Sequence, residues 1–108
     1  MANFDVTITD NSDVFKDALP EQIERALIAI GLAAESHAKE LCPVDTGRLR
    51  NSISHETDSD SVYIGTNVEY AAFVELGTSK MKARPYLRPA AENYTNEYRD
   101  LAEQALKS

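Results

Sequence analysis

The chain has 108 residues, of which 43% are hydrophobic and 27% charged, and its net charge at pH 7 is −7. This length predicts one domain spanning residues 1–108, and the composition is typical of a soluble globular protein rather than a disordered one. No run approaches the roughly 18 apolar residues of a membrane span, and the first residues lack a signal-peptide pattern, so we expect a cytoplasmic product. The single cysteine excludes an intrachain disulfide and a cysteine-based metal site within one chain.

The acidic charge is unevenly distributed along the chain. Arg48 and Arg50 form one short basic segment, and residues 77–89 hold four basic residues and no acidic one. A chain that is acidic overall is not expected to bind DNA over its whole surface, because such binding depends on basic groups that release counterions. The two basic segments therefore either meet an acidic partner surface or are solvated loop charges.

The first half of the chain predicts a strand followed by a long helix. Residues 3–9 alternate apolar and polar side chains, which indicates a half-buried strand. A turn at residues 10–13 and a short helical piece at 14–19 follow. From Pro20 to about Leu41, apolar side chains recur every three or four positions, as in an amphipathic helix. Gly31 and many alanines narrow this helix, so we expect another element to pack closely against it.

The middle of the chain predicts a short turn and a hairpin. Asp45 or Thr46 can cap a turn that directs Leu49 and Ile53 inward. Residues 52–57 and 61–66 then have the composition of two strands joined by a polar turn, with a possible bulge at Gly65.

The segment from residue 70 to residue 91 concentrates the unusual features of the chain. Residues 69–76 predict a short helix, with Ala72, Phe73 and Leu76 on one side and Gly77 at its end. A basic loop without periodicity follows, and Pro89 is suited to begin the last helix. The predicted fold is α+β: a small antiparallel β-sheet packed against one long amphipathic helix, with a short helix and a C-terminal helix.

A search for catalytic chemistry finds only weak signals. Asp45-Thr46-Gly47 is the triplet of aspartic proteases, and a chain of this length could act as a dimer. However, a long helix precedes the triplet and Arg48 follows it, whereas that active site lies in a nearly all-β protein. A local structural role, in which Asp45 and Thr46 bind backbone N–H groups and Gly47 permits the turn, explains it better.

The remaining reactive side chains do not form a recognisable site. Nothing in the spacing of Cys42, His37 and His55 requires a thiol–imidazole pair, and two histidines with scattered carboxylates make no metal-ligand pattern. The four glycines are isolated, so there is no glycine-rich phosphate loop. We therefore predict no enzyme activity, no cofactor and no metal. The tyrosines near basic residues could stack on nucleic bases, but core or subunit contacts explain them better.

Two segments resemble one protein family. Residues 42–53, CPVDTGRLRNSI, are similar to its PVDTG-x-L-R-x-S-I block, and residues 70–78, YAAFVELGT, with residues 84–90, RPYLRPA, are similar to its second block. This is the family of small head–tail joining, neck or tail-completion proteins of long-tailed (siphovirus-like) bacteriophages and prophages. The resemblance covers nearly the whole chain.

The resemblance implies a structural role in the virion. Members are expected to form homo-oligomeric rings at the neck, around the channel through which DNA leaves the head. Partners would be other copies of the chain, connector or head-closure proteins, and tail-tube or tail-terminator proteins, with assembly in the host bacterial cytoplasm and DNA passing without specific binding. It supplies no catalytic residues. The residues expected at motifs or assembly interfaces are Asp45, Thr46, Gly47, Arg48, Tyr70, Gly77, Lys80, Lys82, Arg84, Pro85, Tyr86, Leu87, Arg88 and Pro89.

Two alternatives remain open at this point. The basic residues between positions 80 and 88, together with the tyrosines, could form a nucleic-acid-binding module, although the acidic chain argues against it. An aspartic-protease-like dimer through Asp45 is the other alternative.

Overall fold

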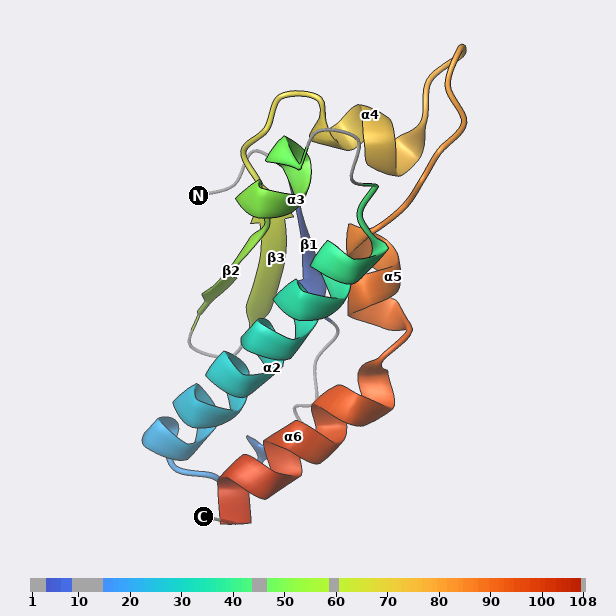
Figure 1. The fold of residues 1–108 in the computed structure, drawn as a ribbon. Helices are drawn as coiled ribbons and strands as arrows, with labels where there is room; N and C mark the ends of the chain where they lie inside the picture. The colour runs from blue at the N-terminus through green and yellow to red at the C-terminus, as the bar shows by residue number, and fades with distance from the viewer. Residues whose placement is uncertain (1–3, 9–14, 44–46, 59–60, 108) are drawn as a thin grey trace.

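The computed structural model describes residues 4–8, 15–43, 47–58 and 61–107. It is an α+β fold in which a three-stranded antiparallel sheet lies against a long helix, as predicted (Figure 1). The elements are β1 (Phe4–Ile8), α2 (Pro20–Leu41), α3 (Arg48–Ser52), β2 (Ser54–Thr57), β3 (Val62–Thr66), α4 (Ala71–Leu76), α5 (Leu87–Glu92) and α6 (Thr95–Lys107).

The sheet has the order β1-β3-β2, so that β3 is central. Ile64 pairs with Val6 on one side and with His55 on the other, and Gly65 pairs with a residue on each side in the same continuous register. The predicted bulge at Gly65 is therefore wrong, because both neighbouring ladders continue through it. The strand predicted from Ser52 begins at Ser54, because residues 48–52 form a helical turn.

Helix α2 has the predicted limits, from Pro20 to Leu41. Cys42 adopts an extended conformation before Pro43, which ends the helix. The buried face of α2 is built from small and branched side chains: Ala26, Leu27, Ile30, Gly31, Ala34 and Ala38. A Cβ atom added at Gly31 would overlap the imidazole ring of His55 on β2. The close packing predicted from Gly31 is therefore confirmed.

Helix α6 packs along α2, and the end of the chain differs from the prediction. Tyr98 is fully buried and donates a hydrogen bond to the Ala90 carbonyl. Instead of one helix that begins at Pro89, α5 begins at Leu87 and a turn at residues 93–94 separates it from α6. Pro89 lies in the first turn of α5, where its missing N–H removes no helical hydrogen bond.

Helix α4 buries a different side from the one its apolar residues suggest. Phe73 and Leu76, on the predicted apolar side, are 57% and 64% exposed, whereas Ala71 and Glu75 are buried. The helix begins at Ala71 rather than Glu69 and ends at Leu76, directly before Gly77, which has a φ of 78°. A buried carboxylate thus takes the place where an apolar side chain was expected.

Several predictions concern residues outside the described part of the chain. The turn at residues 10–13, Val14 at the start of the short helical piece, and capping by Asp45 or Thr46 all lie there. In the described part, Gly47 is the residue before α3, and Leu49 and Ile53 are buried as predicted. No helix of the described residues is both long enough and apolar enough to cross a membrane.

Candidate assembly interface

The two distinctive segments of the sequence lie against each other in the fold. Arg48 at the start of α3 forms a two-pronged ion pair with Glu69, at 3.2 Å from Nη1 to Oε1 and 3.0 Å from Nη2 to Oε2. The Arg48 guanidinium also lies 5.6 Å from the centre of the Tyr70 ring. Hydrogen bonding to its own backbone, followed by the Arg48 guanidinium, lowers the pKa of Glu69. These contacts join α3 to the residues that lead into α4.

Hydrogen bonds of Ser52 and Thr66 also stabilise the contact between α3 and the residues that lead into α4. The hydroxyls of Ser52 and Thr66 are hydrogen-bonded, and the Ser52 hydroxyl also lies 2.6 Å from the Leu49 carbonyl as a donor. The Val68 N–H donates to the Thr66 hydroxyl at 3.1 Å. Thr66 is only 1% exposed, and its polar atom is satisfied within the fold. The last residue of β3 therefore positions both α3 and the segment that precedes α4.

Glu75 organises the second segment. Its side chain is buried, and its two oxygens accept three backbone hydrogen bonds: Oε1 from the N–H groups of Tyr86 at 3.0 Å and Leu87 at 2.8 Å, and Oε2 from Arg88 at 3.1 Å. The first N–H groups of a helix have no partner within it, and a negative charge is favourable at this end. The carboxylate of Glu75 thus caps α5 and ties it to α4.

The residues around Glu75 close the base of the basic loop, residues 78–85. The Arg84 N–H donates to the Val74 carbonyl at 2.8 Å, and the buried Tyr86 hydroxyl donates to the Ala71 carbonyl at 3.3 Å. Gly77 has a positive φ, and a Cβ atom there would lie 2.7 Å from the Ala83 nitrogen. Gly77 is therefore required both for its conformation and for the return of the loop.

The basic loop projects from the end of the molecule that carries α3 and α4 (Figure 1). Thr78 and Met81 form reciprocal backbone hydrogen bonds of 2.8 and 3.4 Å, so the tip of the loop has a defined turn. Lys80, Lys82 and Arg84 are exposed on it. The loop is a protruding basic surface on a base that is hydrogen-bonded and buried.

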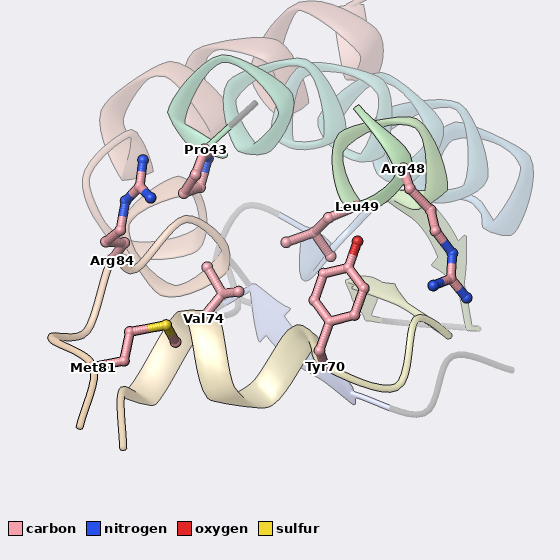
Figure 2. Close-up of a pocket in the computed structure, with 7 residues that line it drawn as sticks. All are labelled: Pro43, Arg48, Leu49, Tyr70, Val74, Met81 and Arg84. Atoms are coloured by element: carbon pink, nitrogen blue, oxygen red, sulfur yellow. The ribbon is translucent and has the colours of Figure 1, made fainter. Parts of the chain in front are cut away.

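An open pocket lies between the two segments, with a volume of about 400 Å³ (Figure 2). We call it the Tyr70 pocket. Its lining consists of five largely apolar side chains and two arginines: Pro43, Leu49, Tyr70, Val74, Met81, Arg48 and Arg84. Figure 2 shows Arg48 and Arg84 at opposite sides of the pocket, with Leu49, Tyr70 and Val74 between them. The walls are mainly apolar, and the Arg48 guanidinium at one side is paired with Glu69.

The reactive side chains considered from the sequence are not brought together. Cys42 is buried and donates to the Pro43 carbonyl at 3.3 Å, and burial raises the pKa of its thiol. The His37 ring stacks on Tyr94 with centroids 3.6 Å apart, while His55 Nδ1 lies 2.8 Å from Glu35 Oε1. Among the described residues, no group of three or more His, Cys, Asp or Glu side chains could hold a metal ion.

The structure divides the predicted interface residues into three sets. Tyr86 and Leu87 are fully buried, as residues that anchor the loop must be. Lys80, Lys82, Arg84 and Pro85 are exposed on the loop, and Arg88 is exposed on α5, where its Nη1 lies 3.2 Å from Glu92 Oε2. Arg48 lines the pocket from α3 and Tyr70 from the residue before α4, and Gly47 directly precedes α3, whereas Asp45 and Thr46 are outside the described residues.

Sequence reasoning did not identify the roles of Glu75 and Met81. The available signal was that Glu75 is the single carboxylate in the apolar run from Tyr70 to Leu76. This run ends directly before Gly77. A carboxylate that is buried at that place requires a set of hydrogen-bond donors. No pattern in the sequence points to Met81, because its position in the pocket depends on how the loop returns.

Comparison with known families identifies the class of protein to which this chain belongs. A family model described as "Bacteriophage HK97-gp10, putative tail-component" matches residues 7–77, which is more than half of the chain. The chain belongs to this family and is a structural component of a bacteriophage tail. No curated protein and no solved structure matches it.

Proposed function

We propose that this tail component is a head–tail connector, neck or tail-completion protein that assembles as a homo-oligomeric ring around the channel through which DNA leaves the head. The observation that supports this proposal is the exposed basic loop, whose base is held by the hydrogen bonds of Glu75. A loop of net positive charge on an acidic chain gives docking an orientation, because complementary charges select one approach over others.

The buried base supports docking rather than a purely solvated loop. Backbone hydrogen bonds to the Glu75 carboxylate and to the Val74 carbonyl fix the return of the chain. A loop held in one conformation before binding loses less conformational entropy when it docks. The acidic partner surface would belong to a neighbouring copy or to the connector or tail-tube protein next to the ring.

The whole chain acts as one domain in this proposal, and its virion partners are proteins rather than DNA. The remaining surface is acidic on balance, so that DNA in the channel would slide past rather than bind.

Labelling of the protein in purified particles, followed by electron microscopy, tests the proposal. The expected result is a label at the junction of head and tail. Absence of the protein from this junction, with label elsewhere along the tail, would contradict the neck assignment and leave the family assignment intact. DNA binding with a steep salt dependence that requires Lys80, Lys82 and Arg84 would favour a nucleic-acid-binding module instead.

A further inference from the structure

The side of α2 that points away from the fold has an apolar centre. The sheet and α6 lie against other sides of the helix (Figure 1). With about 3.6 residues per turn, six residues form the side opposite the buried Ile30. We call them the outer stripe: Glu21, Arg25, Ile28, Leu32, Glu35 and Lys39. Ile28 and Leu32, one turn apart, are 41% and 57% exposed. The outward side of a surface helix is ordinarily polar, so solvation explains the charged ends of the stripe but not its centre.

The order of the charges makes the outer stripe complementary to its own reverse. From beginning to end the stripe reads acidic, basic, apolar, apolar, acidic, basic. When two such helices lie antiparallel and centred on Ile30, complementary side chains reach the same height along the pair: Glu21 and Lys39, Arg25 and Glu35, Ile28 and Leu32. A parallel pair would bring like charges together, which is unfavourable. The charges thus select a second copy of the same helix in one orientation.

Ion pairs within the chain are compatible with this contact. Lys39 Nζ lies 3.0 Å from Glu35 Oε2, and His55 Nδ1 lies 2.8 Å from Glu35 Oε1. Arg25 also interacts within its own chain. An antiparallel partner does not have to break these interactions, because it adds opposite charges beside them. Glu35 and Lys39 then meet Arg25 and Glu21 of the other copy in a group of four alternating charges. Such networks contribute more than single exposed ion pairs.

The exposed apolar pair on α4 does not have this arrangement. Phe73 and Leu76 are 57% and 64% exposed and lie at the end that carries the basic loop (Figure 1). Residues 77–89 hold four basic side chains and no acidic one, so two copies of that surface would repel each other. Of these two apolar pairs, only the one on α2 has flanking charges that fit a second copy.

We propose that two copies of the chain form a two-fold symmetric dimer through the outer stripe, with their α2 helices antiparallel. Ile28 and Leu32 of both copies form its apolar centre, and the charged groups fix the register. A contact along one side of one helix is at the small end of specific interfaces, so we expect a Kd between about 10 μM and 1 mM. The inference does not rest on the proposed ring, because a contact that uses the same surface on both copies closes at two.

Analytical ultracentrifugation of the native chain at concentrations up to about 1 mM tests the contact. The expected result is a dimer fraction that rises with concentration and a mass that stops at two chains. Ile28→Gln with Leu32→Gln should fold like the native chain, since both side chains are exposed, and should remain monomeric. The control, Phe73→Gln with Leu76→Gln, removes the exposed apolar pair of α4 and should dimerise like the native chain. A native chain that is monomeric at about 1 mM, or dimers that persist without Ile28 and Leu32, would overturn the proposal.

Charge reversal tests the antiparallel orientation. Glu21→Lys places two basic groups opposite each other at both ends of the contact, and Lys39→Glu places two acidic groups there. Each variant alone should therefore dimerise at least about tenfold more weakly than the native chain. A mixture of the two variants opposes basic to acidic side chains at both ends again, and its affinity should return to within about threefold of the native value.

A matched pair of variants controls for the change in net charge. Glu92→Lys and Lys107→Glu reverse exposed charges outside α2, and neither these variants nor their mixture should alter dimerisation. Circular dichroism establishes that all four variants fold. If mixing Glu21→Lys with Lys39→Glu gives no gain in affinity, the antiparallel contact is wrong. The neck assignment is tested separately by the position of the label in particles, so the two proposals can fail independently.

Discussion

The body around α2 and the end that carries the basic loop are stabilised in different ways. In the body, many small side chains bury their surface together, and Gly31 allows the His55 ring to approach the helix. At the loop end, the two oxygens of Glu75 hold three backbone N–H groups of another segment. Stability in the body is spread over many contacts, whereas one carboxylate supplies three of the hydrogen bonds that hold the base of the loop. The loop end should therefore be more sensitive to a single substitution.

The largest effect is expected for Glu75→Ala. Removal of the carboxylate leaves the buried N–H groups of Tyr86 and Leu87 without an acceptor, which should cost about 3 to 5 kcal/mol of unfolding free energy in urea denaturation. Glu75→Gln keeps one acceptor oxygen and should lose less. Glu92→Ala is the control, because Glu92 is 52% exposed and its ion pair with Arg88 is worth at most about 1 kcal/mol. Equal losses for Glu75→Ala and Glu92→Ala would contradict the capping role.

The next largest effect is expected for Gly31→Ala in the body. Whether this substitution lowers or raises the unfolding free energy should depend on whether residue 55 is histidine or alanine. Gly31→Ala should cost about 1 to 3 kcal/mol, because the new methyl group overlaps the His55 ring. In a His55→Ala background, the same change should stabilise the protein by about 0.5 to 1 kcal/mol, since alanine is a better helix former than glycine. Urea unfolding of the four chains completes a double-mutant cycle. Destabilisation of the same size in both backgrounds would show that the imidazole ring of His55 is not the cause of the destabilisation.

A smaller, pH-dependent effect is expected at Glu35 on the α2 side of the body. Burial raises the pKa of Glu35, but hydrogen bonds from His55 and Lys39 outweigh it and hold the pKa below the ordinary 4.5. A carboxyl whose pKa is lower in the folded state stabilises the protein above pH 4.5, and this contribution is lost as the pH falls through the folded value.

The comparison of the native chain with Glu35→Gln measures this contribution. The stability difference should be at most about 1 kcal/mol at pH 5 and should shrink as the pH falls below 4.5. Unfolding free energies at several pH values between 3 and 7 provide the test. A difference that stays constant down to pH 3 would mean that the Glu35 interactions do not depend on its charge.

The contrast between the two regions also explains which parts could be predicted from the sequence. Helix α2, β1 and the hairpin follow from repeating patterns of apolar residues, which extended burial produces. Pro20 and Pro43 mark the limits of α2 through local steric rules that act within a few residues. The α+β class and the role of Gly31 therefore came from the sequence.

The site was less accessible because it depends on contacts between distant segments. Glu75 satisfies N–H groups eleven to thirteen residues away, and no local periodicity shows such a partner. The start of α5 at Leu87 follows from this cap, so the choice of Pro89 as the helix start was wrong. The exposed side of α4 was misassigned for the same reason, because the buried position belongs to a carboxylate. The Tyr70 pocket likewise combines residues from α3, α4 and the basic loop.

We propose the basic loop as a docking surface on a base that folds without it. The most direct measurement compares two triple variants in parallel: Lys80→Ala with Lys82→Ala and Arg84→Ala in the loop, and Lys16→Ala with Arg99→Ala and Lys107→Ala elsewhere, which remove the same charge from exposed positions. Both should unfold within about 0.5 kcal/mol of the native chain, as exposed substitutions usually do. We predict that only the loop variant is lost from purified particles. Incorporation of the loop variant at the native level, or a loss of folding in that variant alone, would contradict the claim.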